Sequence, residues 1–207
     1  MTGDGAPVII HDSSLDRTTN RRGPLVDLDS SELDTVDAGA WFAPAYQGVR
    51  LPRLAELIDF INDRAINANI ELKSHESGEA GTSQLIDAVI KELARLDPER
   101  EIIISSFSPL VLDRFHQRAP EYTIAMLWTK ETLGPDWLSV LEMVGATYAH
   151  LENEGLTEAI VKAITSAGYG VSVWTVNDRA RANELFNWGC TGIFSDVATH
   201  MLDFQQV

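Results

Sequence analysis

After residue 50 the chain repeats one pattern, in which a short apolar run is followed by a segment whose apolar residues recur at helical spacing. The first helical segment places Leu54, Leu57 and Ile58 on one face, shortly after Pro52. Strict alternation of strands and helices predicts a parallel sheet covered by helices. The predicted strands are 69–73, 102–105, 122–127, 147–150, 171–175 and 192–194, and the predicted helices cover 54–61, 85–93, 110–115, 137–144, 160–164, 179–188 and 198–204.

Two sheet closures are compatible with six such strands. A doubly wound open sheet usually carries a glycine-rich turn after its first strand, and the sequence contains no G-x-G-x-x-G. A (β/α)₈ barrel needs eight strands, and the segment before residue 50 supplies one short apolar run, predicted as a strand at 8–10. We therefore expect an α/β fold of the TIM barrel type, incomplete, with the first two strands missing. No linker interrupts the pattern, so we interpret residues 1–207 as a single barrel domain.

The formal net charge of −15 argues against a nucleic-acid or anionic-membrane partner, because both favour basic patches. An anionic substrate would need a local positive centre, made of Lys and Arg side chains or a bound metal ion. No apolar run is long enough to span a bilayer, and residues 1–7 do not resemble a signal peptide. The single Cys190 is expected to be a partly buried, inert thiol. A cytoplasmic location is the default expectation.

Glu71 and Lys73 stand two apart on a predicted strand, so both side chains point to the face opposite Ile70 and Leu72. Packing two charges under apolar helices would cost several kcal/mol. We therefore expect both in the barrel lumen near the carboxyl ends of the strands, where the active sites of barrel enzymes lie. A structural ion pair at a strand end explains the spacing equally well.

His11 and Asp12 follow the run 8–10, and a histidine at a strand end can act as a general acid or base near neutral pH. By itself this pair fits a surface loop better. His75 is either a ligand or a solvent-facing loop residue. Other side chains at predicted strand ends would form a barrel rim, although each also fits a cap, a loop or, for the tryptophan, a core position: Ser105, Ser106, His150, Glu152, Trp174 and Asp196.

Taken together, these segments resemble the glycerophosphodiester phosphodiesterase family. The stretch from Thr2 to Asp12 resembles the signature T-x-D-G-x-x-V-x-x-H-D. Further matches follow in family order along nearly the whole chain: Leu15-Asp16-Arg17-Thr18-Thr19, Asp37-Ala38-Gly39 with Trp41, Leu51-Pro52-Arg53-Leu54, Asn69-Ile70-Glu71-Leu72-Lys73, Ser105-Ser106-Phe107, Trp174-Thr175-Val176-Asn177 and Gly192-Ile193-Phe194-Ser195-Asp196. At Arg53 the family more often has Thr.

The resemblance implies metal-dependent hydrolysis of glycerophosphodiesters to glycerol 3-phosphate and an alcohol, so the expected partner is a small molecule. It assigns His11 as the second of two catalytic histidines and Glu71 as the third acidic metal ligand. It also assigns Lys73 to the phosphate and Trp174 to an aromatic wall of the substrate site. Oxygen ligands favour Mg²⁺ or Ca²⁺ over zinc, and a bound cation would offset the negative charge of the protein.

The sequence departs from the family at its front. The strand ending His-Arg-Gly, with the first catalytic histidine, and the Glu-x-Asp strand, with two metal ligands, are both absent from these residues. We therefore expect this form to hydrolyse its substrate poorly or not at all. The alternatives are a non-catalytic truncated relative that binds phosphodiesters or is an inactive fragment, and a barrel phosphodiesterase acting on a cyclic or inositol phosphodiester. An unfinished barrel also exposes two sheet edges, which predicts self-association.

Overall fold

The computed structural model describes residues 1–73 and 78–201. It contains two compact units, which are described separately below. Unit 1 comprises Met1–Ala68 and Ser74–Glu101, and unit 2 comprises Asn69–Lys73 and Ile102–Val207. Nothing in this division tests whether 1–207 is one functional domain, so that interpretation stays a prediction. None of the described helices is long and apolar enough to cross a membrane.

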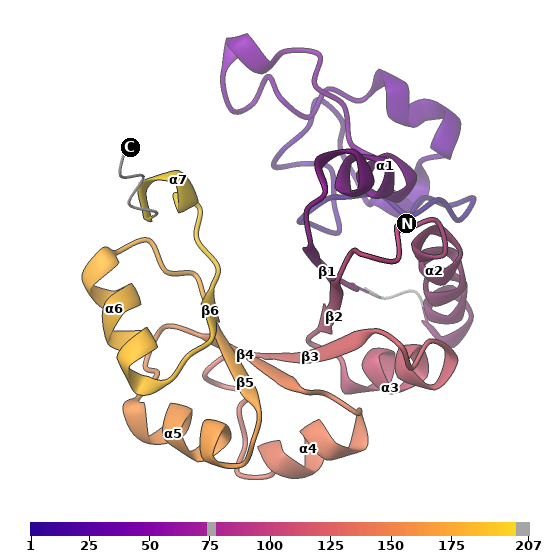
Figure 1. Cartoon of the computed structure of the whole chain (residues 1–207). Helices are drawn as coiled ribbons and strands as arrows, with labels where there is room; N and C mark the ends of the chain where they lie inside the picture. The colour runs from indigo at the N-terminus through magenta and orange to yellow at the C-terminus, as the bar shows by residue number, and fades with distance from the viewer. Residues whose placement is uncertain (74–77, 202–207) are drawn as a thin grey trace. The chain divides into compact units, whose positions relative to one another are not determined.

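Unit 2 is built on a sheet whose strand order, β1-β2-β3-β4-β5-β6, follows the sequence. The pairs from β2 to β6 are parallel, and the sheet curls into half of a barrel (Figure 1). The expectation of an incomplete TIM barrel is therefore confirmed. The strands are β1 Ala68–Glu71, β2 Ile102–Ser106, β3 Thr123–Trp128, β4 Tyr148–Glu152, β5 Gly170–Trp174 and β6 Gly192–Ile193.

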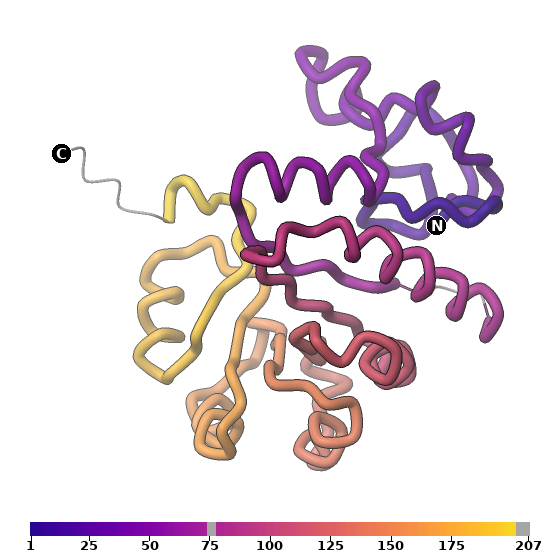
Figure 2. The backbone as a smooth tube through the Cα atoms, turned by 45° about the vertical axis from the view of Figure 1, so that its right-hand side comes forward, coloured from indigo at the N-terminus to yellow at the C-terminus, as the bar shows by residue number. Residues whose placement is uncertain are grey.

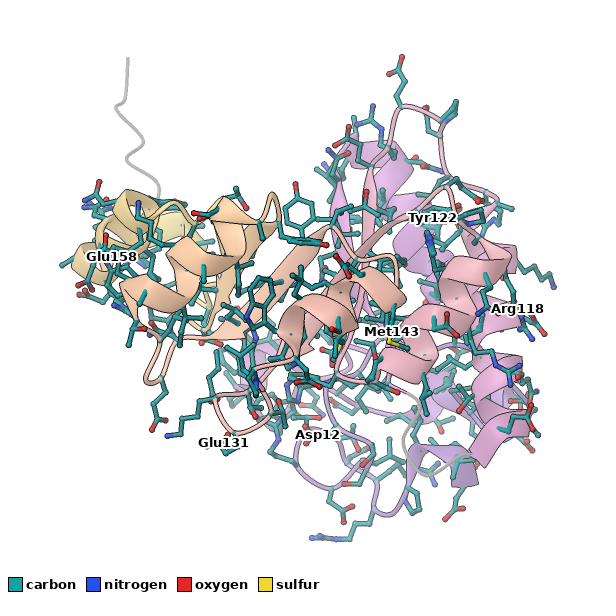
Figure 3. The ribbon with its side chains drawn as sticks, turned by 90° about the horizontal axis from the view of Figure 1, so that it is seen from below. Asp12, Arg118, Tyr122, Glu131, Met143 and Glu158 are labelled. Carbon is teal, nitrogen blue, oxygen red and sulfur yellow. The ribbon has the colours of Figure 1, made fainter. Side chains whose placement is uncertain are left out.

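Helices α3 to α6 cover the convex side of this sheet (Figures 1 and 2). Their starts follow from the sequence, because Ser108, Thr157 and Asp178 cap α3, α5 and α6 with side-chain oxygens. Figure 3 labels Met143 on α4 and Glu158 on α5, both exposed residues of this layer. The helices are α3 Pro109–Arg118, α4 Trp137–Met143, α5 Glu158–Ser166, α6 Arg179–Trp188 and α7 Ala198–Met201. The remainder of the predicted closing helix, 202–204, lies outside the described residues.

Residues on each strand alternate between the helix-covered side and the concave side, which we call the inner face. On β5, Val171 and Val173 are fully buried, whereas Ser172 and Trp174 between and after them are half-buried. The register pairs Ser172 with His150 on β4, so His150 also belongs to the inner face. This alternation decides which side chains can form a site.

Unit 1 contains two helices, α1 Leu54–Arg64 and α2 Gly78–Leu93, and three short 3₁₀ helices, η1 Leu25–Asp27, η2 Ser30–Thr35 and η3 Pro44–Tyr46. The predicted strand at 8–10 is wrong as a regular strand. Only an isolated antiparallel bridge joins Val8 to Arg53, with one more bond from the Ile9 amide to the Pro52 carbonyl. Val8 and Ile10 instead pack against a cluster of buried residues, whereas Ile9 is exposed. The cluster consists of Leu15, Leu25, Leu28, Leu33, Val36 and Leu51.

Candidate active site

The carboxyl end of β1 carries an ion pair. Glu71 is the last residue of the strand, and its Oε2 lies 3.6 Å from Nζ of Lys73, with side chains 27% and 24% exposed. Between and before them Leu72 and Ile70 are buried. The two charged side chains thus share the face that their spacing predicts, opposite the apolar pair.

The neighbouring residue Asn69 shows that this is the inner face. Its Nδ2 donates a hydrogen bond of 2.9 Å to Oγ of Ser105 on β2, and Ser105 pairs in register with Ala125 on β3. The other oxygen of the Glu71 carboxylate, Oε1, is buried and has no hydrogen-bond partner among the described residues. A buried carboxylate oxygen without a partner can accept a hydrogen bond from a ligand or bind a cation.

Two aromatic rings from distant strands meet on unit 2. Trp174, the last residue of β5, and Phe107, just after β2, make an edge-to-face contact with ring centroids 5.6 Å apart at 86°. Phe107 is half exposed, so the pair presents ring surface outward. Trp174 is further held by its Nε1, which donates to the carbonyl oxygen of His150 at 3.4 Å. Because Phe107 lies two residues beyond Ser105, this contact connects the Glu71 side of the sheet to the Trp174 side.

His150 is a buried polar side chain of the inner face, with 1% of its surface exposed. Its ring contacts the ring of Phe194 edge-to-face at a centroid distance of 5.0 Å. Burial lowers the pKa of His150 from its usual 6.5 to about 4, because the charged imidazolium would be poorly solvated. His150 is therefore neutral at neutral pH.

The loops after β5 and β6 are joined by a small hydrogen-bond network. Asn177 donates from Nδ2 to Oδ2 of Asp196 at 3.0 Å, and its Oδ1 accepts from both the Ser195 hydroxyl and the Asp196 amide. Asp196 was expected at the rim, and the structure places it in this exposed loop pair. The network therefore connects the loop that follows Trp174 to the loop that follows β6.

On unit 1, His11 and Asp12 form a hydrogen-bonded pair. His11 Nδ1 lies 2.8 Å from Asp12 Oδ1, and Asp12 also accepts from Nε and Nη2 of Arg17 at 2.6 and 2.8 Å. The Arg17 bonds, with a smaller contribution from His11, hold the pKa of Asp12 well below its ordinary value. An ionised carboxylate can only accept, so Nδ1 carries the hydrogen and Nε2 is the basic nitrogen of His11. The His11 side chain is 80% exposed.

The donor set fits a divalent cation only in part. Glu71 offers a buried oxygen with no hydrogen-bond partner among the described residues, which suits a hard cation. However, residues 1–73 and 78–201 contain no group of three or more His, Cys, Asp or Glu side chains placed to hold a metal ion. The described residues thus supply one ligand and not a complete protein site.

The four side chains predicted for the site fall into both units. Glu71, Lys73 and Trp174 belong to unit 2 and share its inner face, while His11 belongs to unit 1. The assignment of His11 and Glu71 to one site concerns both units and stays a prediction. His75 lies outside the described residues.

Sequence reasoning assigned no role to Phe107 beyond its place in a matching motif. Its position directly after the predicted strand end at Ser105-Ser106 was the one feature that could have placed it near the site. Nothing in the sequence alone indicated which distant ring it would touch.

A half-barrel with a charged pair and an aromatic pair at the carboxyl ends of its strands belongs to the α/β barrel class, whose enzymes have their active sites at that end. Comparison with known proteins gives the family. Residues 1–200 match the model of the Glycerophosphoryl diester phosphodiesterase family, and the chain belongs to this family of phosphodiester hydrolases.

Individual relatives agree with this assignment. A glycerophosphodiester phosphodiesterase of Bacillus subtilis is 31% identical over 208 residues, covering 95% of this chain and 71% of the relative. One of Caldanaerobacter subterraneus is 31% identical over 196 residues, with 95% and 79% covered. A phosphodiesterase of Oleispira antarctica, solved in complex with the product sn-glycerol-3-phosphate, superposes with a TM-score of 0.91 at 30% identity, with 97% and 80% covered.

Proposed function

We propose that this protein hydrolyses glycerophosphodiesters to sn-glycerol 3-phosphate and an alcohol, and that the reaction depends on Mg²⁺ or Ca²⁺. The observation that carries the proposal is the pair at the end of β1, in which one ammonium group and one carboxylate with a buried, unpartnered oxygen share the inner face. The family match and the product-bound relative support the choice of substrate.

In this proposal Lys73 binds the phosphate. Its ammonium group neutralises a phosphoryl oxygen, which matters because the protein carries a net charge of −15 and would otherwise repel the substrate. The ion pair with Glu71 at 3.6 Å holds Lys73 at the strand end before substrate arrives. Trp174 and Phe107 provide an apolar wall that excludes water from one side of the substrate.

His11 is the proposed acid–base residue. With Nδ1 bound to Asp12, its Nε2 can carry out one of the two proton transfers, either taking up the proton of an attacking hydroxyl or water or donating one to the leaving alcohol. Asp12 stabilises the imidazolium that forms after proton uptake, as a carboxylate does beside a catalytic histidine. Arg17 keeps Asp12 ionised and in place.

A bound cation would supply neutralisation of the phosphoryl oxygens, and Glu71 is the described residue that would hold it through Oε1. In the same proposal, Glu71 keeps Lys73 oriented through Oε2 while Oε1 faces the ion. This division of the two oxygens is the reason that Glu71, rather than the exposed carboxylates of the outer helices, is expected to govern metal dependence.

The test is an assay of this chain on glycerophosphocholine, with choline and glycerol 3-phosphate measured as separate products. We expect slow release of both in equal amounts with Mg²⁺ or Ca²⁺ present, because the His-Arg-Gly and Glu-x-Asp segments are absent from these residues. Release should be lost in EDTA and restored by adding the ion back. Release of phosphocholine and glycerol would contradict the proposed bond cleavage. Turnover that persists in EDTA would contradict the metal dependence.

A second candidate function is phosphodiester binding without turnover. It is favoured by one observation, that the described residues supply a single carboxylate to the proposed ion rather than a cluster. Calorimetry separates the two functions. Binding of glycerophosphocholine with no product after prolonged incubation with either ion would establish the binder and exclude the enzyme.

A further inference from the structure

Four buried side-chain nitrogen or oxygen atoms of the described residues lack a hydrogen-bond partner: Glu71 Oε1, His116 Nδ1, and Nδ1 and Nε2 of His150. His116 lies on α3, in the outer helical layer. The other three atoms lie on the inner face, on β1 and β4. Buried polar groups in native proteins are nearly always paired, so their concentration on one face indicates that this face receives a polar ligand.

The surroundings of His150 offer its ring no polar partner. The rings of Phe194 and Tyr148 lie 5.0 and 6.3 Å away, centroid to centroid. The Nε1 of Trp174 donates to the backbone carbonyl of His150 and not to its ring. On β5 the register partner is Ser172, whose Oγ lies so close to Gly192 on β6 that a Cβ there would be 3.0 Å away, so a glycine is needed beside that hydroxyl.

The chemistry of the missing partner follows from the charge state of the ring. A neutral imidazole has one donor and one acceptor nitrogen, and burial keeps His150 neutral. The oxygens of an ionised phosphodiester or carboxylate only accept at neutral pH, and an ammonium group only donates, so each would satisfy one nitrogen at most. A hydroxyl group both donates and accepts. Adjacent hydroxyls, as in glycerol, match the two nitrogens of His150 and the nearby Ser172.

We propose that His150 is a substrate-binding residue that hydrogen-bonds a hydroxyl group of the glycerol moiety on the inner face of the half-barrel. The inference rests on the proposed function, since it assumes that a glycerol phosphate occupies this face with its phosphate at Lys73. It adds a specificity determinant: His150 distinguishes glycerol phosphate from phosphate alone.

The first test compares the binding of sn-glycerol 3-phosphate and of inorganic phosphate by the full chain, using calorimetry. We expect His150→Leu to weaken glycerol 3-phosphate binding by about 10-fold, as loss of a ligand hydrogen bond commonly does, and to leave phosphate binding unchanged. His150→Gln, which keeps a donor and an acceptor, should restore part of the affinity. His116→Leu is the matched control, because it removes a histidine with a buried, unpartnered nitrogen from the outer layer; we expect no change for either ligand.

Equal weakening of both ligands by His150→Leu would show a structural role and overturn the inference. Unchanged binding of glycerol 3-phosphate would overturn it as well. If the wild-type chain neither hydrolyses glycerophosphocholine nor binds glycerol 3-phosphate, the proposed function fails, and the inference fails with it. If the wild type hydrolyses glycerophosphocholine and His150→Leu binds glycerol 3-phosphate as the wild type does, the inference fails while the proposed function stands.

A second measurement needs no folded variant at this position. The chain has five histidines, and long-range ¹H–¹⁵N spectra resolve the ring nitrogens of each. The resonances of the His150 ring are identified by through-bond correlation with its assigned backbone amide. We expect glycerol 3-phosphate, but not inorganic phosphate, to shift these resonances. Binding of glycerol 3-phosphate with no shift at these nitrogens would overturn the inference.

Discussion

The two oxygens of the Glu71 carboxylate differ in their surroundings, because only one of them faces Lys73. Oε2 of Glu71 lies 3.6 Å from the Lys73 ammonium, whereas Oε1 is buried with no hydrogen-bond partner among the described residues. An ion pair that uses one oxygen and leaves the other for a ligand differs from a purely structural pair, in which both oxygens would be satisfied or solvated. This asymmetry is the basis of the first prediction.

Glu71→Gln should lower turnover of glycerophosphocholine by about 100-fold or more. The substitution removes the charge of a proposed metal ligand, so it should weaken binding of the ion and also loosen the orientation of Lys73. The Mg²⁺ or Ca²⁺ concentration giving half-maximal activity should rise in parallel. Glu158→Gln, at the exposed start of α5 (Figure 3), is the matched control and should change neither quantity. A Glu71→Gln variant with lowered turnover but unaltered metal dependence would remove Glu71 from the metal site and leave it as a partner of Lys73 only.

Asp12→Asn should reduce turnover without altering metal affinity, because the amide can present its NH₂ group to His11 Nδ1 and so favour the wrong tautomer. His11→Ala should lower turnover by about 10²–10⁴-fold, the usual range for loss of a general acid–base residue. Both effects are measured as kcat, with ion affinity followed separately by calorimetry. Loss of ion binding in His11→Ala would mean that His11 is a ligand rather than a proton carrier.

Trp174→Phe should raise KM for glycerophosphocholine by a few-fold and leave kcat nearly unchanged, because a ring remains against Phe107 while the bond from Nε1 to the His150 carbonyl is lost. Trp174→Ala should raise KM further, by about 10-fold. Trp137→Phe alters another edge-to-face pair, with Tyr169, and serves as the control for general effects of losing an indole. If Trp174→Ala leaves KM unchanged, Trp174 is a packing residue and not a wall of the site.

His150 should make the stability of the protein depend on pH on the acidic side. Its pKa is about 4 in the folded chain and near 6.5 in the unfolded chain, so the unfolded state binds more protons between these values. The free energy of unfolding should therefore be unaffected by this group above about pH 6.5 and should fall as pH drops toward 4, by roughly 1 kcal/mol per pH unit.

The measurement is urea unfolding of the wild type and of His150→Leu at about pH 7 and about pH 5. The wild type should lose more stability than the variant between the two conditions. Equal losses would show that His150 is accessible to protons in the folded state, which would contradict the burial of its ring.

The sequence by itself determined the order and type of the elements of unit 2. The periods of the apolar residues are local properties, and they predicted the six strands and the helices between them. In unit 2 the bounds moved by a few residues at most, as where β4 extends to Glu152, whereas α2 of unit 1 begins at Gly78, well before the predicted 85–93. The spacing of Glu71 and Lys73 also determined that they share a face, because side chains alternate along any strand. At 8–10 the same reasoning failed, since an apolar run can pack into a cluster without pairing as a strand.

The tertiary structure alone decided what those side chains meet. Phe107 contacts Trp174 because the curl of the sheet brings the ends of β2 and β5 together, although the residues stand far apart in the sequence. His150 was one of several polar residues at strand ends, and only the packing of Phe194, Tyr148 and the neighbouring strands buried it and left its ring nitrogens unpaired. Periodicity assigns a residue to a face, but burial and pairing depend on the side chains that other strands bring to that face.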